Sequence, residues 1–348
     1  MKNTASRLSC LMAGTLLVAA PAGAETLTIA SWGGVFQEAQ RTLYFTPFAE
    51  EAGIELLEDE FVGGIGVLRA QVMAGTPNWN VVQVEAEELT LGCEEGLFVP
   101  IDYSQLDFAP EDFIDGAATE CGVGTIVWSK VLGYDANRLD SAPESWADFW
   151  DTETWPGTRA LRRGAQYNLE IALMADGVPA DEVYETLRSE EGVERAFAKL
   201  DELRDTLIWW EAGAQPLQML AAGEVVMTSV YNGRLTASNR NEGTNFQGVW
   251  PGSIYAIDSW VILEGTPNVE TAHAFISFAS DPERQAQMPA YIAYGTTHAS
   301  ASDFVPEEYA ADLPTTPANL EEAIEFDTEF WVENIESLTE RFDRWAAR

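Results

Sequence analysis

Five side chains that could together hold a small organic cation lie at or near the ends of apolar, strand-like segments of this 348-residue chain. They are Trp32, Glu85, Tyr231, Asp258 and Tyr294. An ammonium group gains about 0.5–2 kcal/mol over the face of an aromatic ring, and a carboxylate in the same cleft neutralises its charge. Core packing explains any one of the rings taken alone. Their joint placement at strand ends indicates a site for an alkylammonium ligand.

Asp258 is informative because it interrupts the apolar run 254–263. A carboxylate buried in such a strand is costly unless something pairs with it. Two kinds of partner are open at this point. One is a backbone donor or arginine of the protein itself, and the other is the cation of a bound ligand.

Strand-like and helix-like segments alternate along the chain, which predicts an α/β fold. Open α/β sheets bind ligands beyond the carboxyl ends of their strands, which is where the candidate residues lie. At roughly 100–200 residues per domain, the length of the chain favours two lobes. No Pro/Ser-rich linker separates them, so we expect two strands to cross between the lobes, near Trp128 and Tyr255.

The first 24 residues have the pattern of an export signal. Two basic residues precede an apolar run at 11–20, and the small residues Ala22 and Ala24 suit cleavage after Ala24. That run is about half the ~20 residues that a membrane span needs. The sequence therefore predicts a secreted, periplasmic protein whose mature chain begins at Glu25.

Cysteine and histidine are scarce in the predicted mature chain. Cys93 and Cys121 remain as an even pair in an oxidising compartment, which predicts one disulfide. The histidines are His273 and His298, and no ligand spacing joins them to the cysteines, so we expect no metal site.

Enzymatic motifs are missing from the sequence: we find no nucleophile elbow, phosphate-binding loop, dinucleotide fingerprint or zinc-protease motif. We therefore expect a protein without catalytic activity or cofactor. A remote alternative is a secreted hydrolase that uses a pair of carboxylates.

The formal net charge of −38 excludes a basic face for nucleic acid. Such a field attracts cations, but an adaptation for solubility in a salty habitat is the preferred explanation of the charge. The expected partners are therefore a small ligand and a membrane permease, and we expect the protein to be a monomer.

Four segments give the chain a resemblance to a known family. The segments are 27–32, 79–96, 225–234 and 254–294, the last of which contains Asp258-Ser259, Ala272-His-Ala-Phe-Ile-Ser-Phe, Ser280-Asp-Pro-Glu-Arg and Tyr294-Gly-Thr-Thr. In order and spacing they resemble the periplasmic spermidine/putrescine-binding proteins of ABC importers. The resemblance implies the two-lobed type II periplasmic-binding fold, with two hinge crossover strands and a ligand cleft between the lobes. It also implies ligand delivery to a permease after hinge closure.

The resemblance carries over to particular positions. Trp32, Asp258 and Tyr294 match ligand-contacting positions of that family, whereas Glu85 replaces a small hydroxyl residue and Tyr231 replaces a tryptophan. Further candidates for ligand contact are Gly33, Gly34, Arg163, Tyr167, Arg234 and Tyr255.

One departure from the family pattern bears on the ligand. The acidic pair of the second lobe has no counterpart, because Gly164 and Tyr167 stand where it should fall, just after Arg162 and Arg163. Arginines and glycine amides bind carboxylates, and Arg234 could act in the same way. Surface charges explain Arg162 and Arg163 equally well.

The sequence thus predicts a periplasmic solute-binding protein for a polyamine of the putrescine or spermidine type. The alternative is a zwitterion such as an amino acid or γ-aminobutyrate, held by arginine and glycine amides. Lobe 1 is expected to comprise residues 25–128 plus 258–300, and lobe 2 residues 129–257 plus 301–348.

Overall fold

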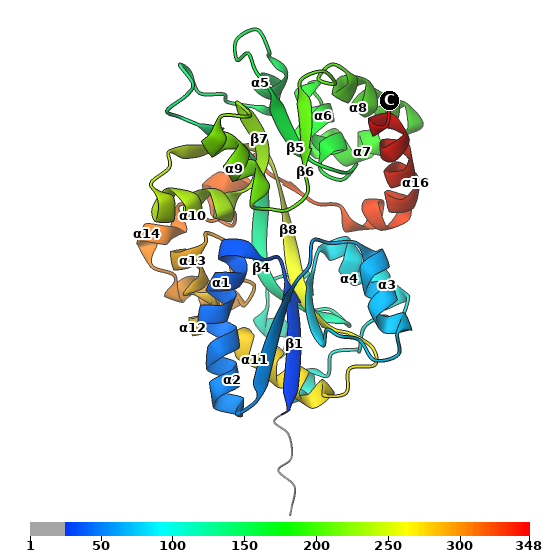
Figure 1. Ribbon diagram of the computed structural model, residues 1–348, viewed down its shortest axis with the longest axis vertical. Coiled ribbons are helices and arrows are strands. Elements are labelled where there is room, and N and C mark those ends of the chain that lie inside the picture. Colours follow the sequence, from blue (N-terminus) through cyan, green and yellow to red (C-terminus); the bar gives the residue numbers. More distant parts are fainter. Residues whose placement is uncertain (1–24) are drawn as a thin grey trace, which may run out of the picture.

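The computed structural model describes residues 25–348, which form a mixed sheet flanked by helices on both faces (Figure 1). The predicted export signal, residues 1–24, and its cleavage site lie outside the described residues. The strands are β1 (Thr26–Ser31), β2 (Glu55–Glu60), β3 (Val81–Val84), β4 (Gly122–Asp135), β5 (Arg159–Arg162), β6 (Leu207–Trp210), β7 (Met227–Tyr231), β8 (Phe246–Ile262) and β9 (Ile324–Glu325). From Glu25 to the C-terminus, no helix has both the length and the apolar character that a membrane crossing requires.

The strand order is β2-β1-β3-β8-β4-β7-β5-β6, with β9 paired to β8. Strands β2, β1 and β3 are parallel, as are β7, β5 and β6. Between these two groups lie the long strands β4 and β8, which pair antiparallel along most of their length. In Figure 1, β4 and β8 run through both halves of the molecule, while each group of short strands belongs to one half.

This arrangement is the two-lobed α/β fold that the sequence predicts. The two long strands are the crossovers expected near Trp128 and Tyr255, since Trp128 lies on β4 and Tyr255 on β8. Every residue of β4 except Asp135 is buried, because helices cover both faces of the sheet around it. The residue boundaries of the two lobes stay a prediction.

The helices cover both faces of each half (Figure 1). In the lower half of that view α1, α2 and α11 lie on one side and α3 and α4 on the other; in the upper half α9 and α10 lie opposite α6, α7, α8 and α16. The helices are α1 (Gly34–Gln40), α2 (Thr46–Ala52), α3 (Ile65–Met73), α4 (Ala86–Glu94), α5 (Trp146–Trp150), α6 (Asn168–Ala175), α7 (Val183–Leu187), α8 (Glu190–Asp201), α9 (Gln215–Ala222), α10 (Asn232–Glu242), α11 (Val269–Ala279), α12 (Pro282–Gln285), α13 (Met288–Tyr291), α14 (Glu307–Ala310), α15 (Pro317–Leu320) and α16 (Thr328–Ala346).

The predicted disulfide is present. Cys93 on α4 is bonded to Cys121, which directly precedes β4, and the Cα atoms lie 5.7 Å apart. The bridge fixes α4 against the start of a crossover strand. It therefore stiffens the half of the molecule that carries Glu85 at the start of α4.

Candidate ligand-binding site

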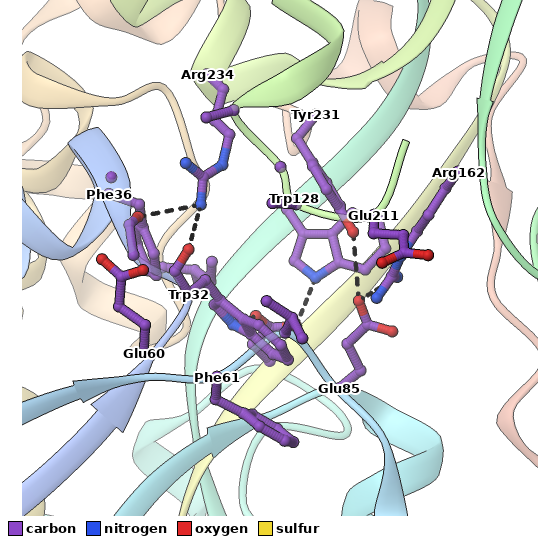
Figure 2. Close-up of a pocket in the computed structure, with 18 of the residues that line it drawn as sticks. Trp32, Phe36, Glu60, Phe61, Glu85, Trp128, Arg162, Glu211, Tyr231 and Arg234 are labelled. Atoms are coloured by element: carbon purple, nitrogen blue, oxygen red, sulfur yellow. Dashed lines mark hydrogen bonds and ion pairs between the residues drawn. The ribbon is translucent and has the colours of Figure 1, made fainter. Parts of the chain in front are cut away.

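A cavity of about 130 Å³ lies where residues that follow β1 and β3 meet residues at the ends of β5 and β7 (Figure 2). This is the expected position for a ligand in an open α/β sheet, beyond the carboxyl ends of the strands. The predicted residues that line the cavity are Trp32, Gly33, Gly34, Glu85, Tyr231, Arg234, Asp258 and Tyr294. All five principal candidates are therefore brought together.

Asp258 provides a buried negative charge at the cavity wall. It is 2% exposed and accepts hydrogen bonds from Trp32 Nε1 at 2.6 Å, Trp128 Nε1 at 2.6 Å and Gln83 Nε2 at 3.0 Å. These donors are neutral, and no salt bridge to Asp258 forms within the described chain. Burial first, and then the charge of Glu85, raise the pKa of Asp258 to about 8. The side chain is thus held in place by neutral donors only, and the positive charge of a bound ligand would favour its ionised form.

The turn after β1 brings Trp32 to the cavity. Gly33 and Gly34 have φ values of 62° and 58°, a left-handed conformation that favours glycine. A Cβ atom at Gly34 would lie 3.0 Å from the guanidinium of Arg234, so the backbone approaches that side chain closely. The indole of Trp32 stacks on Phe61, with ring centroids 5.3 Å apart. Gly33 and Gly34 therefore shape the site by their backbone.

Glu85 is paired with the protein itself. Its carboxylate accepts from Arg162 Nη1 at 2.7 Å, from the Tyr167 hydroxyl at 3.2 Å and from the Tyr231 hydroxyl at 3.4 Å. Burial pushes the pKa of Glu85 up, but the charges of Arg162 and Lys130 together outweigh it, so the net pKa lies below the ordinary value. Glu85 follows β3 and Arg162 ends β5, so this ion pair joins the two halves of the molecule.

Arg234 provides a positive charge without a carboxylate partner. It lies in the first turn of α10, is 4% exposed, and donates from Nη2 to the carbonyls of Trp32 at 2.9 Å and Gly33 at 3.3 Å. No salt bridge to it forms in the part of the chain that the structure describes. A Cβ atom at Gly213 would lie 2.8 Å from its Nε, so that glycine makes room for the guanidinium.

Three predicted residues do not line the cavity. Arg163 is exposed and pairs with Asp343 at 2.8 Å, and Tyr255 donates to Glu325 at 3.2 Å on the surface. Tyr167 is buried behind the cavity wall, where it donates to Glu85 and packs edge-on against Trp128. Of the adjacent pair Arg162 and Arg163, it is Arg162 that lines the cavity.

Sequence reasoning missed several residues of the wall. They are Phe36, Phe61 and Trp128 inside, and Glu60 and Glu211 at the exposed rim. The register of the crossover strands, which pairs Ile126 with Asp258, places Trp128 beside the carboxylate. That register is not readable from one sequence.

Comparison with known proteins identifies the family. Residues 44–316 match the family described as bacterial extracellular solute-binding protein. A γ-aminobutyric acid-binding protein of Pseudomonas aeruginosa is 47% identical over 343 residues, which cover 99% of this chain and 97% of that protein. The chain belongs to the bacterial extracellular solute-binding proteins.

Two further relatives bear on the site of this solute-binding protein. The solved Atu4243 GABA receptor is 32% identical and superposes with a TM-score of 0.81, covering 93% of this chain and 98% of that one. A putrescine/cadaverine-binding protein of Pseudomonas aeruginosa is 24% identical over 342 residues, 90% of this chain and 92% of that protein. The resemblance to polyamine-binding proteins therefore holds at the level of the family. The relative that is 47% identical is named for γ-aminobutyric acid, which is the alternative ligand of the sequence analysis.

The geometry of the site is that of a binding site in an ABC transporter's solute-binding protein. Polar contacts join the halves around the cavity: Arg162 to Glu85 at 2.7 Å, Arg234 to the Trp32 carbonyl at 2.9 Å, and Gln166 to Glu87 at 2.8 Å. These contacts hold the two halves together around the cavity. Its walls offer the buried Asp258 and Arg234 without ion-pair partners, the exposed carboxylates Glu60 and Glu211 at the rim, and several aromatic faces, which suits recognition of a small charged molecule.

Proposed function

We propose that this protein binds γ-aminobutyrate, or an ω-amino acid of similar length, in the periplasm and delivers it to the permease of an ABC importer. The observation that carries the proposal is the pair Asp258 and Arg234. Each lines the same cavity, each is almost fully buried, and neither has an oppositely charged partner among residues 25–348. An ammonium on Asp258 and a carboxylate on Arg234 would satisfy both charges.

The separation of the two charges supports an ω-amino acid over an α-amino acid. Trp32 lies between them: its backbone carbonyl accepts from Arg234, and its indole nitrogen donates to Asp258 (Figure 2). The two charged groups are thus separated by about the length of a tryptophan side chain. A ligand that reaches both needs several methylene groups between its ammonium and its carboxylate, and these can pack on the indole.

The polyamine hypothesis has less support in the cavity. A diamine that is fully enclosed needs a second buried anion, and Glu85, the other buried carboxylate of the wall, already accepts from Arg162; the remaining acidic groups of the wall, Glu60 and Glu211, lie at the exposed rim. The aromatic walls and the putrescine/cadaverine-binding relative favour an amine of some kind, which a zwitterion also supplies. The zwitterion is therefore the better match.

The proposal includes the cellular setting. Export through the predicted signal, action as a monomer, and hinge closure between lobe 1 (25–128 plus 258–300) and lobe 2 (129–257 plus 301–348) all belong to it. The polar contacts that join the halves support the closing motion, because a ligand that bridges both halves shifts the protein toward the closed state.

Calorimetric titration of ligand-stripped protein tests the function. We expect heat with γ-aminobutyrate and much weaker binding of n-butylamine, butyrate and putrescine. Arg234→Met should weaken γ-aminobutyrate at least 100-fold, whereas Arg163→Met, the matched control at an exposed arginine, should leave it unchanged. Tighter binding of putrescine than of γ-aminobutyrate by the unaltered protein would refute the proposal.

A further inference from the structure

A buried lysine lies directly behind the cavity wall. Lys130 is 0% exposed, and its Nζ has no hydrogen-bond partner within the described residues. It lies on β4, two residues after Trp128 and in antiparallel register with Tyr231 of β7. Residues at this spacing and register share one face of a sheet, so the three side chains are neighbours.

Four aromatic rings surround the amine of Lys130. Its Nζ lies 4.0 Å from the ring centroid of Tyr167, 4.5 Å from Tyr231, 5.2 Å from Trp210 and 5.8 Å from Trp128. We call these four rings the aromatic cage. An arrangement of several π faces around one nitrogen is the kind of site that binds organic ammonium groups.

The aromatic cage shares walls with the ligand cavity. Trp128 and Tyr231 line the cavity, whereas Lys130 does not, so these two rings stand between the lysine and the ligand. Trp128 also donates to Asp258, and Tyr231 to Glu85. The cage therefore adjoins the part of the cavity where the buried carboxylates lie.

The backbone of Tyr167 indicates that the cage is built at some cost. Its φ of 68° is the one positive value at a non-glycine position among the described residues. Such a conformation costs of order 1–3 kcal/mol and persists where the surrounding structure requires it. Here it holds the Tyr167 ring against Lys130 while its hydroxyl donates to Glu85.

The charged groups near Lys130 bear on which ligands the adjoining cavity can accept. The pKa of Lys130 lies well below its ordinary value, because burial and then the charge of Arg162 outweigh the opposing charges of Glu85, Glu170 and Glu87. Arg162 lines the cavity beside Glu85. A second ligand ammonium at this end would thus meet a guanidinium as well as an occupied cage, and like charges repel.

We propose that Lys130 determines specificity: its amine fills a cation-binding cage next to the ligand cavity and thereby excludes ligands that carry a second ammonium. The inference rests on the proposed function in so far as the first ammonium is taken to bind Asp258. A diamine anchored there would direct its other end toward Tyr231 and Glu85. Arg162 already neutralises Glu85 there, and the amine of Lys130 occupies the cage behind Tyr231, so a monoamine with a carboxylate is accepted and a diamine is not.

Putrescine and γ-aminobutyrate titrations of three variants test the inference. Lys130→Ala empties the cage, and Lys130→Met fills it with an uncharged chain of similar length. Lys199→Met is the matched control, because Lys199 also lies over a tryptophan ring, Trp150 at 5.9 Å, but far from the cavity walls. We expect putrescine to bind at least tenfold more tightly to Lys130→Ala than to the unaltered protein, and severalfold more tightly to Lys130→Met. Lys199→Met should show no change.

Failure of the inference differs from failure of the proposed function. Unchanged putrescine affinity in folded Lys130→Ala and Lys130→Met would overturn the inference, as would tight putrescine binding by the unaltered protein. If the unaltered protein does not bind γ-aminobutyrate, but Lys130→Ala binds putrescine more tightly than the unaltered protein does, only the proposed ligand is refuted. If melting curves show that Lys130→Ala does not fold, Lys130→Met decides the question, because it keeps the volume of the buried chain.

Discussion

Replacement of Asp258 by asparagine should separate ligand binding from stability. The carboxylate is 2% exposed and is held by neutral donors only, so its charge serves no partner within the described chain. Removal of one partner of a buried, hydrogen-bonded ion pair costs about 3–5 kcal/mol. At the lower limit, the affinity of Asp258→Asn for γ-aminobutyrate falls by about 100-fold, since 1.4 kcal/mol corresponds to tenfold.

The same substitution should raise the free energy of unfolding at alkaline pH, although it lowers the affinity for the ligand. The pKa of Asp258 is raised from 3.8 to about 8 in the folded protein, so folding costs free energy once the unfolded chain has released this proton. The cost appears as the pH rises above 3.8 and is complete near pH 8. This difference between the folded and unfolded pKa of Asp258 corresponds to about 6 kcal/mol. The asparagine variant avoids this cost, but it leaves one indole donor unpaired at about 1–3 kcal/mol.

Ligand-free Asp258→Asn should therefore melt at or above the temperature of the unaltered protein at pH 8, and at or below it at pH 5. The assay combines calorimetric titration with thermal melts at both pH values. Asp343→Asn is the control, because Asp343 is an exposed carboxylate paired with Arg163. If Asp258→Asn loses melting temperature at pH 8 as severely as it loses affinity, Asp258 is a structural residue and the reasoning fails.

Three further predictions concern pH, closure and the disulfide. Because the ligand ammonium needs an ionised Asp258 whose pKa is about 8, affinity should rise by up to tenfold per pH unit from pH 6 to 8 and level off above; a flat titration profile would contradict this. Arg162→Met and Glu85→Gln should each weaken binding, and the double variant should lose much less than the sum; additive losses would mean that the ion pair does not support closure. Cys93→Ser plus Cys121→Ser should lower the free energy of unfolding by about 3–4 kcal/mol in chemical denaturation, since the bridge closes a loop of 28 residues; equal stability would refute it.

The strand ends of the site were predictable from the sequence. Trp32, Glu85 and Tyr231 follow apolar strands, and parallel strands bring their carboxyl ends to one edge of a sheet. Asp258 was also predictable, since a carboxylate in an apolar strand needs a partner. The sequence left open whether that partner is the protein or a ligand. In the structure, the neutral donors Trp128 and Gln83 position the carboxyl group without forming an ion pair with it.

Two features depend on tertiary register and were not predictable. Whether Arg162 or Arg163 faces the cavity depends on where β5 ends, and a shift of one residue along a strand reverses its face. Glu85 was expected to bind a ligand cation, but the approach of Arg162, 77 residues away in sequence, pairs it within the protein. Because this contact neutralises Glu85, the cavity suits a zwitterion better than a diamine.

A crystal structure of the protein with γ-aminobutyrate tests the central claim most directly. We predict the ligand carboxylate on the Arg234 guanidinium, the ammonium on the Asp258 carboxylate, and the methylene chain along the Trp32 indole. A ligand bound in the reverse orientation, or one whose ammonium displaces Arg162 from Glu85, would contradict the account.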